Sequence, residues 1–205
     1  MRPEEFRELH RIADRHGIIV FSDEVYRESE YDPADRLPPA CDLSERAVSL
    51  GVLSKTYGLP GLRIGWIATR NAAVYARMAA LKDYTTICNS APSEFLAELA
   101  LRNRAGLIER NVAILTANLA LLDDFFKRHQ AAFRWHRPKA GPIGFPRLLG
   151  GKVDAFCHEL VTTAGVLLLP GAVFNDTGQH VRIGFGRRSL PQALARLEAF
   201  LKKRG

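Results

Sequence analysis

Lys55 stands among residue types that can together hold and use one reactive cofactor. The stretch from Ser49 to Thr69 reads S-L-G-V-L-S-K-T-Y-G-L-P-G-L-R-I-G-W-I-A-T, so Arg63 follows the lysine after a Gly/Pro turn. Upstream, Asp23 and Tyr26 close a second apolar segment, I-I-V-F-S-D-E-V-Y. An amine can serve as nucleophile and base, and a guanidinium suits an oxyanion. A buried amine, an acid, a phenol and an arginine are the groups that pyridoxal phosphate needs.

The apolar pattern predicts the elements that must position these residues. The runs 18–21 and 47–53 are short and continuously apolar, which predicts parallel strands buried on both faces. Ligands in open α/β sheets sit at the carboxyl ends of the strands. We therefore expect Asp23 and Lys55 to lie at the same edge of one sheet, with a third strand over 62–68.

The rest of the chain is predicted to contain both helices and strands, separated by loops. The Pro- and Asp-rich stretch 31–44 is expected to be a loop. Helical spacing and turn residues predict helices over 3–16, 71–82, 92–103, 107–130, 152–164 and 190–203, and further strands over 133–136, 143–149, 166–169 and 181–185. The first part is α/β and mostly parallel, and the last part is α+β. We place a domain boundary inside the long helix, giving domains 1–110 and 111–205.

Composition excludes several classes of protein. The 205 residues are 47% hydrophobic and 25% charged, as in an ordinary globular protein. The net charge is +7, but no aromatic-and-basic motif of a nucleic-acid-binding module is present, so no nucleic-acid partner is expected. No uninterrupted apolar run is long enough to cross a membrane, and no membrane partner is expected. Three scattered cysteines without metal spacing favour a cytoplasmic protein with no metal site.

Four segments together resemble the fold type I pyridoxal-phosphate enzymes, and more narrowly the class I/II aminotransferases. They are S-D-E-V-Y, S-K-T-Y-G-L-P-G-L-R-I-G-W, V-L-L-L-P-G-A-V-F and H-V-R-I-G-F-G-R, and the similarity runs over essentially the whole chain. The resemblance implies an α/β fold with a partial parallel sheet. This is the pyridoxal-phosphate-binding large domain with its N-terminal half missing, followed by a small α+β C-terminal domain. It also implies a homodimer in the full-length form.

The resemblance implies a role for each residue around the lysine. Lys55 would form the internal Schiff base and later carry the proton between the substrate α-carbon and C4′ of the cofactor. That requires an amine with a pKa below the ordinary value of ~10.4, which burial beside a cationic cofactor would provide. Asp23 would keep the pyridine nitrogen protonated, and Tyr26 would donate its hydroxyl to the 3′ oxygen.

Further roles concern the two anionic groups to be bound. By resemblance, Arg63 and the Ser54 hydroxyl would bind the cofactor phosphate. The chain departs from the family pattern at Val52, where many relatives carry Ser or Thr, so one phosphate hydrogen bond is expected to be lost. Arg182, in H-V-R-I-G-F, matches the arginine that binds the substrate α-carboxylate.

Some polar residues receive weaker assignments or none. The segment K-D-Y-T-T-I-C-N-S-A-P-S-E matches the region that lies near the neighbouring subunit's cofactor in dimeric relatives, which makes Thr85 and Ser90 candidates there. The histidines show no triad or metal spacing, so we assign no role to His10, His16, His136 and His180.

The favoured function is a pyridoxal-phosphate-dependent aminotransferase, in truncated form, with an amino acid and a 2-oxo acid as substrates. A lyase or an amino-acid cyclase or mutase would use the same cofactor groups, and side chains outside these motifs decide among them. A third alternative is non-catalytic: a truncated reading frame, half of a split enzyme, or the sensor domain of a regulator. No DNA-binding helix-turn-helix is visible for the last of these.

Overall fold

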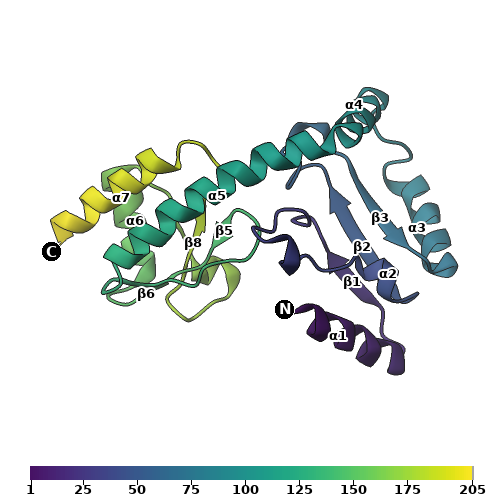
Figure 1. The fold of residues 1–205 in the computed structure, drawn as a ribbon, viewed down its shortest axis with the longest axis horizontal. Coiled ribbons are helices and arrows are strands. Elements are labelled where there is room, and N and C mark those ends of the chain that lie inside the picture. The colour runs from purple at the N-terminus through teal and green to yellow at the C-terminus, as the bar shows by residue number, and fades with distance from the viewer. Residues whose placement is uncertain (205) are drawn as a thin grey trace. The chain divides into compact units, whose positions relative to one another are not determined.

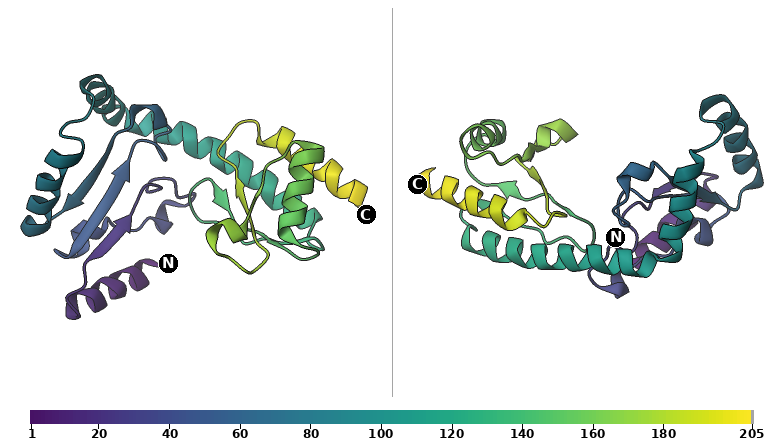
Figure 2. Two further views of the ribbon diagram at one scale, coloured as in Figure 1. Left: turned by 180° about the vertical axis from the view of Figure 1, so that it is seen from behind. Right: turned by 90° about the horizontal axis from the view of Figure 1, so that it is seen from above.

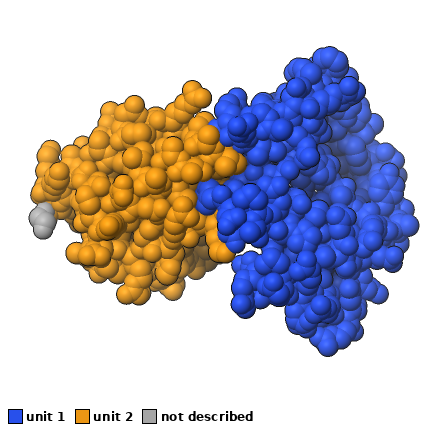
Figure 3. All heavy atoms as spheres, viewed as in Figure 1, with its two compact units in different colours: residues 1–111 blue, residues 112–205 orange. Residues whose placement is uncertain are grey.

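A computed structural model of the protein describes residues 1–204. The chain divides into two compact units, Met1–Asn111 and Val112–Gly205, which are coloured separately in Figure 3. The division falls inside the long helix α5 (Arg104–Arg128), so each unit contains part of it.

The first unit is built around a three-stranded sheet, shown in Figure 1 and from two other sides in Figure 2. Its strands are β1 (Val20–Asp23), β2 (Ala47–Val52) and β3 (Gly65–Thr69), in that spatial order. Strands β1 and β2 are parallel, whereas β3 runs antiparallel to β2. The helices are α1 (Pro3–Arg15), α2 (Ala40–Leu43), α3 (Ala72–Thr85) and α4 (Ala91–Arg102), with 3-10 turns η1 (Pro33–Asp35) and η2 (Pro60–Leu62).

Helix α1 shows why its sequence begins a helix where it does. Pro3 occupies the first turn, where its missing N–H costs nothing, and Glu5 accepts a hydrogen bond from the backbone N–H of Arg2 at 2.7 Å. Phe6 packs in a small core with Ala40 and Ala47. The helix is thereby anchored to α2 and to the start of β2.

Two expectations about this unit were wrong. The run 18–21 is not buried on both faces: Ile18, Ile19 and Phe21 are each more than half exposed. Within the described residues β1 pairs only with β2, so one of its edges and much of its surface lack a partner. The stretch 31–44 is also not loop throughout, since it contains η1 and α2.

The second unit combines helices α6 (Val153–Ala164) and α7 (Leu190–Arg204) with short antiparallel strands. Strands β5 (Ile143–Gly144), β8 (Val181–Gly184) and β7 (Leu169–Pro170) form one sheet, with β8 in the centre. Strands β4 (Phe133–Arg134) and β6 (Arg147–Leu148) form a second, and η3 (Gly171–Phe174) follows β7. Helices α6 and α7 pack side by side in every view (Figures 1 and 2).

Helix α5 is long and apolar enough to cross a membrane by length and composition alone, although it contains no uninterrupted apolar run of that length. Its second half carries a buried row at helical spacing, formed by Leu115, Leu119, Leu122, Phe125 and Phe126. Asn118 on this row donates from Nδ2 to the carbonyl oxygens of Phe185 and Arg187, at 2.7 and 2.8 Å. This half of α5 therefore serves as a core helix of the second unit.

Candidate active site

The carboxyl ends of β1 and β2 lie at the same edge of the sheet because the two strands are parallel. Asp23, the last residue of β1, is in register with Leu50 of β2. Beyond β1, the N–H of Glu24 donates to the carbonyl oxygen of Leu50 at 3.0 Å. Lys55 follows three residues after β2 ends at Val52. The fold thus brings the aspartate and the lysine to one edge of the sheet.

Lys55 and Tyr26 face one another across this edge. The Lys55 Nζ lies 5.9 Å from the centroid of the Tyr26 ring, within the range of a cation–π contact. The expectation of a buried amine was wrong for residues 1–204, because the Lys55 side chain is exposed. The two residues that follow it, Thr56 and Tyr57, turn inward and are buried, which leaves the lysine pointing outward.

Ser54 and Arg63 form a pair of donors beside the lysine. The Arg63 Nη1 donates to Ser54 Oγ at 3.4 Å and to the carbonyl oxygen of Pro60 at 3.0 Å. Arg63 also has a left-handed backbone, with φ of 54°, which is unfavourable for a residue other than glycine. Such conformations persist where the surrounding structure enforces them, and they cluster at binding sites. A guanidinium and a hydroxyl in one place suit an oxyanion such as a phosphate.

The loop that carries Lys55 is tied to the turn that carries Tyr26 by the residues after the lysine. The Thr56 hydroxyl donates to the carbonyl oxygen of Val25 at 3.2 Å. The Thr56 carbonyl oxygen accepts from Asn111 Nδ2 at 2.8 Å, at the end of the unit's portion of α5. These bonds hold the loop that carries Lys55 in a fixed position relative to the turn that carries Tyr26.

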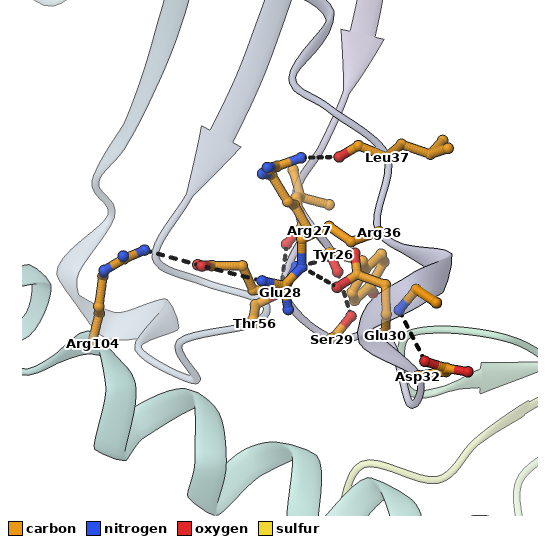
Figure 4. Close-up of polar contacts among 12 residues, drawn as sticks. Tyr26, Arg27, Glu28, Ser29, Glu30, Asp32, Arg36, Leu37, Thr56 and Arg104 are labelled. Carbon is orange, nitrogen blue, oxygen red and sulfur yellow. Dashed lines mark hydrogen bonds and ion pairs between the residues drawn. The ribbon is translucent and has the colours of Figure 1, made fainter. Parts of the chain in front are cut away.

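Glu28 completes this connection and is shown in Figure 4. It is a second residue with a left-handed backbone, at φ of 70°, and its carboxylate accepts from the Tyr57 hydroxyl at 3.2 Å and from Arg104 Nη1 at 3.0 Å. Burial raises the pKa of the Tyr57 phenol, and the neighbouring Glu28 carboxylate raises it further. The phenol therefore stays protonated and keeps donating to Glu28.

The remaining predicted residues of this unit lie apart from these contacts. The Thr85 hydroxyl donates back to the carbonyl oxygen of Leu81 in its own helix, at 3.2 Å, and Ser90 is the N-cap residue of α4 without a side-chain capping bond. Both side chains are exposed. Val52, where relatives carry a hydroxyl, pairs with Gly65 of β3 and offers no donor.

Arg182 belongs to the second unit, on the central strand β8. Its neighbours Val181 and Ile183 point into the core, so Arg182 points to the opposite face. There its guanidinium carbon lies 5.4 Å from the centroid of the Phe174 ring. The side chain is partly exposed and its cation rests on an aromatic surface, which leaves its N–H groups able to bind a carboxylate.

The structure also reveals a pair that sequence reasoning missed. His180 Nδ1 lies 2.9 Å from Asp176 Oδ2, and the His180 ring stacks on Phe145 with centroids 5.0 Å apart and planes 11° from parallel. The hydrogen bond from His180 holds the pKa of the Asp176 carboxyl below its usual value. The signal in the sequence was the Asp-x-x-x-His spacing directly before V-R-I-G.

The groups present fit pyridoxal phosphate. An exposed amine without a hydrogen-bond partner among residues 1–204, a phenol facing it, and an adjacent hydroxyl–guanidinium pair match a phosphorylated aldehyde. The Asp23 carboxylate at the same sheet edge is a partner for a pyridinium, and one of its oxygens accepts from Val25 N at 3.2 Å. Among the described residues no group of three or more His, Cys, Asp or Glu side chains could hold a metal ion.

Comparisons with known proteins agree with this chemistry. The family model for aminotransferase class I and II matches residues 1–197. Capreomycidine synthase of Streptomyces vinaceus is 30% identical over 190 residues, which are 91% of this chain and 48% of that protein. The chain spans about half the length of the curated relatives it matches.

Two solved structures show the same fold. A PLP-dependent aminotransferase from Streptococcus suis superposes with a TM-score of 0.90 at 33% identity, covering 99% of this chain and 54% of that one. A PLP-dependent cyclase superposes with a TM-score of 0.88 at 31% identity, covering 100% of this chain and 56% of that one. The fold is thus a mixed α/β arrangement with a partial parallel sheet, as the sequence predicted.

Proposed function

The chain belongs to the class I and II aminotransferase family, and on this premise we propose that it acts in transferring an amino group between an amino acid and a 2-oxo acid. The cofactor is pyridoxal phosphate. The observation that carries the proposal is the clustering of the Lys55 amine, the Tyr26 ring and the Ser54–Arg63 donor pair at the edge of the sheet where Asp23 ends β1.

When bound, the cofactor supplies an electron-accepting ring that stabilises negative charge at the substrate α-carbon. Lys55 Nζ is the group that takes and returns the α-proton, a task that requires the neutral amine. The Asp23 carboxylate would keep the ring nitrogen of the cofactor protonated, and the Tyr26 hydroxyl would donate to its ring oxygen. Arg63 and Ser54 would hold the phosphate group of the cofactor.

Arg182 is proposed to bind the α-carboxylate of the substrate. The guanidinium makes two parallel hydrogen bonds to a carboxylate, which selects amino acids and 2-oxo acids over simple amines. The support is its position on β8, with the side chain on the face opposite the core and its cation over Phe174.

Reductive trapping with borohydride tests the cofactor site. We expect pyridoxal phosphate to be found covalently attached to the peptide that contains Lys55, by mass spectrometry. The label should disappear in Lys55→Ala and persist in Lys203→Ala, a matched change of an exposed lysine in α7. Equal labelling of both variants, or no label in folded protein, would refute the site.

Another pyridoxal-phosphate reaction is a second candidate, because a PLP-dependent cyclase is among the closely similar structures. Product analysis separates the two. Incubation with a pool of amino acids and a 2-oxo acid should yield a new 2-oxo acid if the activity is amino transfer. Conversion of one amino acid without a 2-oxo acid acceptor would favour the cyclase or lyase alternative, and no turnover with bound cofactor would favour a non-catalytic half.

We also propose a homodimer in the cytoplasm. Apolar side chains of α3, α4 and their connection are exposed, the largest being Tyr75, Tyr84, Ile87 and Phe95, and a second copy would cover such a surface. The three cysteines within the described residues are free thiols, which suits a reducing compartment. Light scattering gives the mass of the assembly, and cell fractionation gives its location.

A further inference from the structure

The loop that precedes Arg182 holds the side chain of His180 in a defined position. Gly171 N donates to the carbonyl oxygen of His180 at 2.7 Å, and Asp176 N donates to the carbonyl oxygen of Gly171 at 3.0 Å. Asn175 and Gln179, on either side of the Asp176–Gly178 turn, both have left-handed backbones, with φ of 58° and 61°. Two such residues within five positions show that tertiary contacts enforce this loop conformation.

Two glycines make room for the Asp176–His180 pair. A Cβ on Gly171 would lie 2.6 Å from Asp176 Oδ2, and a Cβ on Gly178 would lie 2.6 Å from His180 Cε1. Asp176 Oδ2 also accepts from Gly178 N at 3.0 Å. The backbone of the loop thus positions the Asp176 carboxylate, and the carboxylate fixes the orientation of the His180 ring.

The bond to Asp176 determines which nitrogen of His180 is free. The pKa of the Asp176 carboxyl is lowered, so the group is ionised at neutral pH and can only accept hydrogen bonds. Nδ1 must therefore carry a hydrogen, which leaves Nε2 of the neutral ring as an acceptor. Nε2 has no hydrogen-bond partner within residues 1–204. The buried ring nitrogens that lack a partner belong to His10 and His129, so Nε2 of His180 is accessible.

His180 and Arg182 point to the same face of the second unit. They are two residues apart on an extended segment, with Cα atoms roughly 7 Å apart, so their side chains leave the strand on one side. Phe145 and Phe174 contact each other at 6.4 Å between centroids; the first stacks on His180 and the second lies under the Arg182 cation. The result is a continuous, partly exposed surface with a carboxylate-binding group at one end and a hydrogen-bond acceptor at the other.

We propose that His180 is a substrate-binding residue, which accepts a hydrogen bond from the side chain of the amino acid whose carboxylate binds Arg182. The inference rests on the proposed role of Arg182. The ionised Asp176 behind the imidazole favours a donor that is polar or cationic. The substrate class is therefore an amino acid whose side chain ends in N–H groups, such as an amide, ammonium or guanidino group.

Ligand titration followed by NMR tests the proposal on the full chain without cofactor. The probes are L-glutamine, L-arginine and L-norleucine, the last being of similar length without a terminal donor. We expect the first two to bind about tenfold more tightly than L-norleucine, and the His180 ring signal to move with them only. Equal affinity for the three probes, or no shift of the His180 signal up to the solubility limit, would overturn it.

Variants separate the two ends of the surface. His180→Phe keeps an aromatic ring to stack on Phe145 and removes Nε2, so the preference over L-norleucine should vanish while carboxylate binding remains. Arg182→Gln should weaken all three probes together. Asp176→Asn, a near-isosteric change, should also abolish the preference, and it provides the test if His180→Phe fails to fold. A preference unchanged in both His180→Phe and Asp176→Asn contradicts the proposal.

The outcome is independent of the cofactor chemistry. Lys55 takes no part in binding a free amino acid at Arg182 and His180, so Lys55→Ala should retain the preference for N–H-ended side chains. Failure of borohydride trapping at Lys55 together with an intact preference would remove the proposed function and leave this inference standing. Trapping at Lys55 without any preference among the three probes would support the proposed function and refute the role of His180.

Discussion

The guanidinium of Arg63 lies 3.4 Å from the hydroxyl of Ser54, the residue directly before Lys55. The arginine reaches this position because its backbone is left-handed at the end of η2, where β3 turns back along β2. The Arg63 guanidinium and the Ser54 hydroxyl therefore lie together next to the residue that carries the amine. This pair of donors is the proposed binding site of the cofactor phosphate.

Arg63→Gln should weaken pyridoxal phosphate binding about 10- to 100-fold, and Ser54→Ala about 5-fold. A charged donor to a phosphate contributes roughly 1.5–3 kcal/mol, and a neutral hydroxyl about 1 kcal/mol. Equilibrium dialysis measures both affinities. Arg102→Gln, which removes an exposed arginine paired with Glu98 in α4, is the control and should bind as the unmodified chain does. Unchanged binding in Arg63→Gln would show that the phosphate lies elsewhere.

Tyr57 should make the free energy of unfolding depend on alkaline pH. Its pKa is raised in the folded protein, first by burial and then by Glu28, so folding favours the protonated phenol. The stabilisation is complete below the unfolded pKa of ~10 and is lost as the pH rises through the higher folded pKa. Urea unfolding between pH ~8 and ~11 should show a steeper loss of stability in the unmodified chain than in Tyr57→Phe.

The control for this experiment is Tyr84→Phe, since the Tyr84 side chain is 90% exposed. It should follow the same pH profile as the unmodified chain. Identical profiles for Tyr57→Phe and Tyr84→Phe would mean that burial and Glu28 do not raise the pKa of Tyr57.

Cys157 should resist alkylation in the folded protein. Burial raises the pKa of its thiol to about 11, with a smaller contribution from Asp154, so almost no thiolate is present at neutral pH. Cys88 is exposed and should react at the rate of an ordinary thiol. Iodoacetamide labelling followed by peptide mass spectrometry compares the two residues, and labelling in urea should remove the difference. Comparable native rates would contradict the burial of Cys157.

Two adjacent leucines test the orientation of α5 in the second unit. Leu122 is fully buried, whereas Leu121 is 41% exposed. Leu122→Ala should lower the free energy of unfolding by about 2–5 kcal/mol because it leaves a cavity in the core. Leu121→Ala should cost less than about 1 kcal/mol. Similar costs in chemical denaturation would mean that the helix packs through a different face.

Local patterns in the sequence were sufficient for most elements. Helical spacing located all six long helices to within a few residues at each end, since an amphipathic or apolar repeat needs no distant partner to be recognised. The pattern failed for α2, a single turn too short to show a period. The pattern gave no direction for β3, because pairing direction depends on the path of the 3-10 turn that precedes the strand.

The candidate site divides in the same way. The sequence alone determined which residue types stand near Lys55, and the motifs from Asp23 to Arg182 were enough to identify the family. Only the tertiary structure decided that Lys55 is exposed, because Thr56 and Tyr57 take the inward positions beside it. Only the tertiary structure paired His180 with Asp176, since left-handed backbones at Asn175 and Gln179 shape the loop and two glycines leave room for the pair. Residue types follow from the chain itself, whereas exposure and pairing depend on contacts between distant segments.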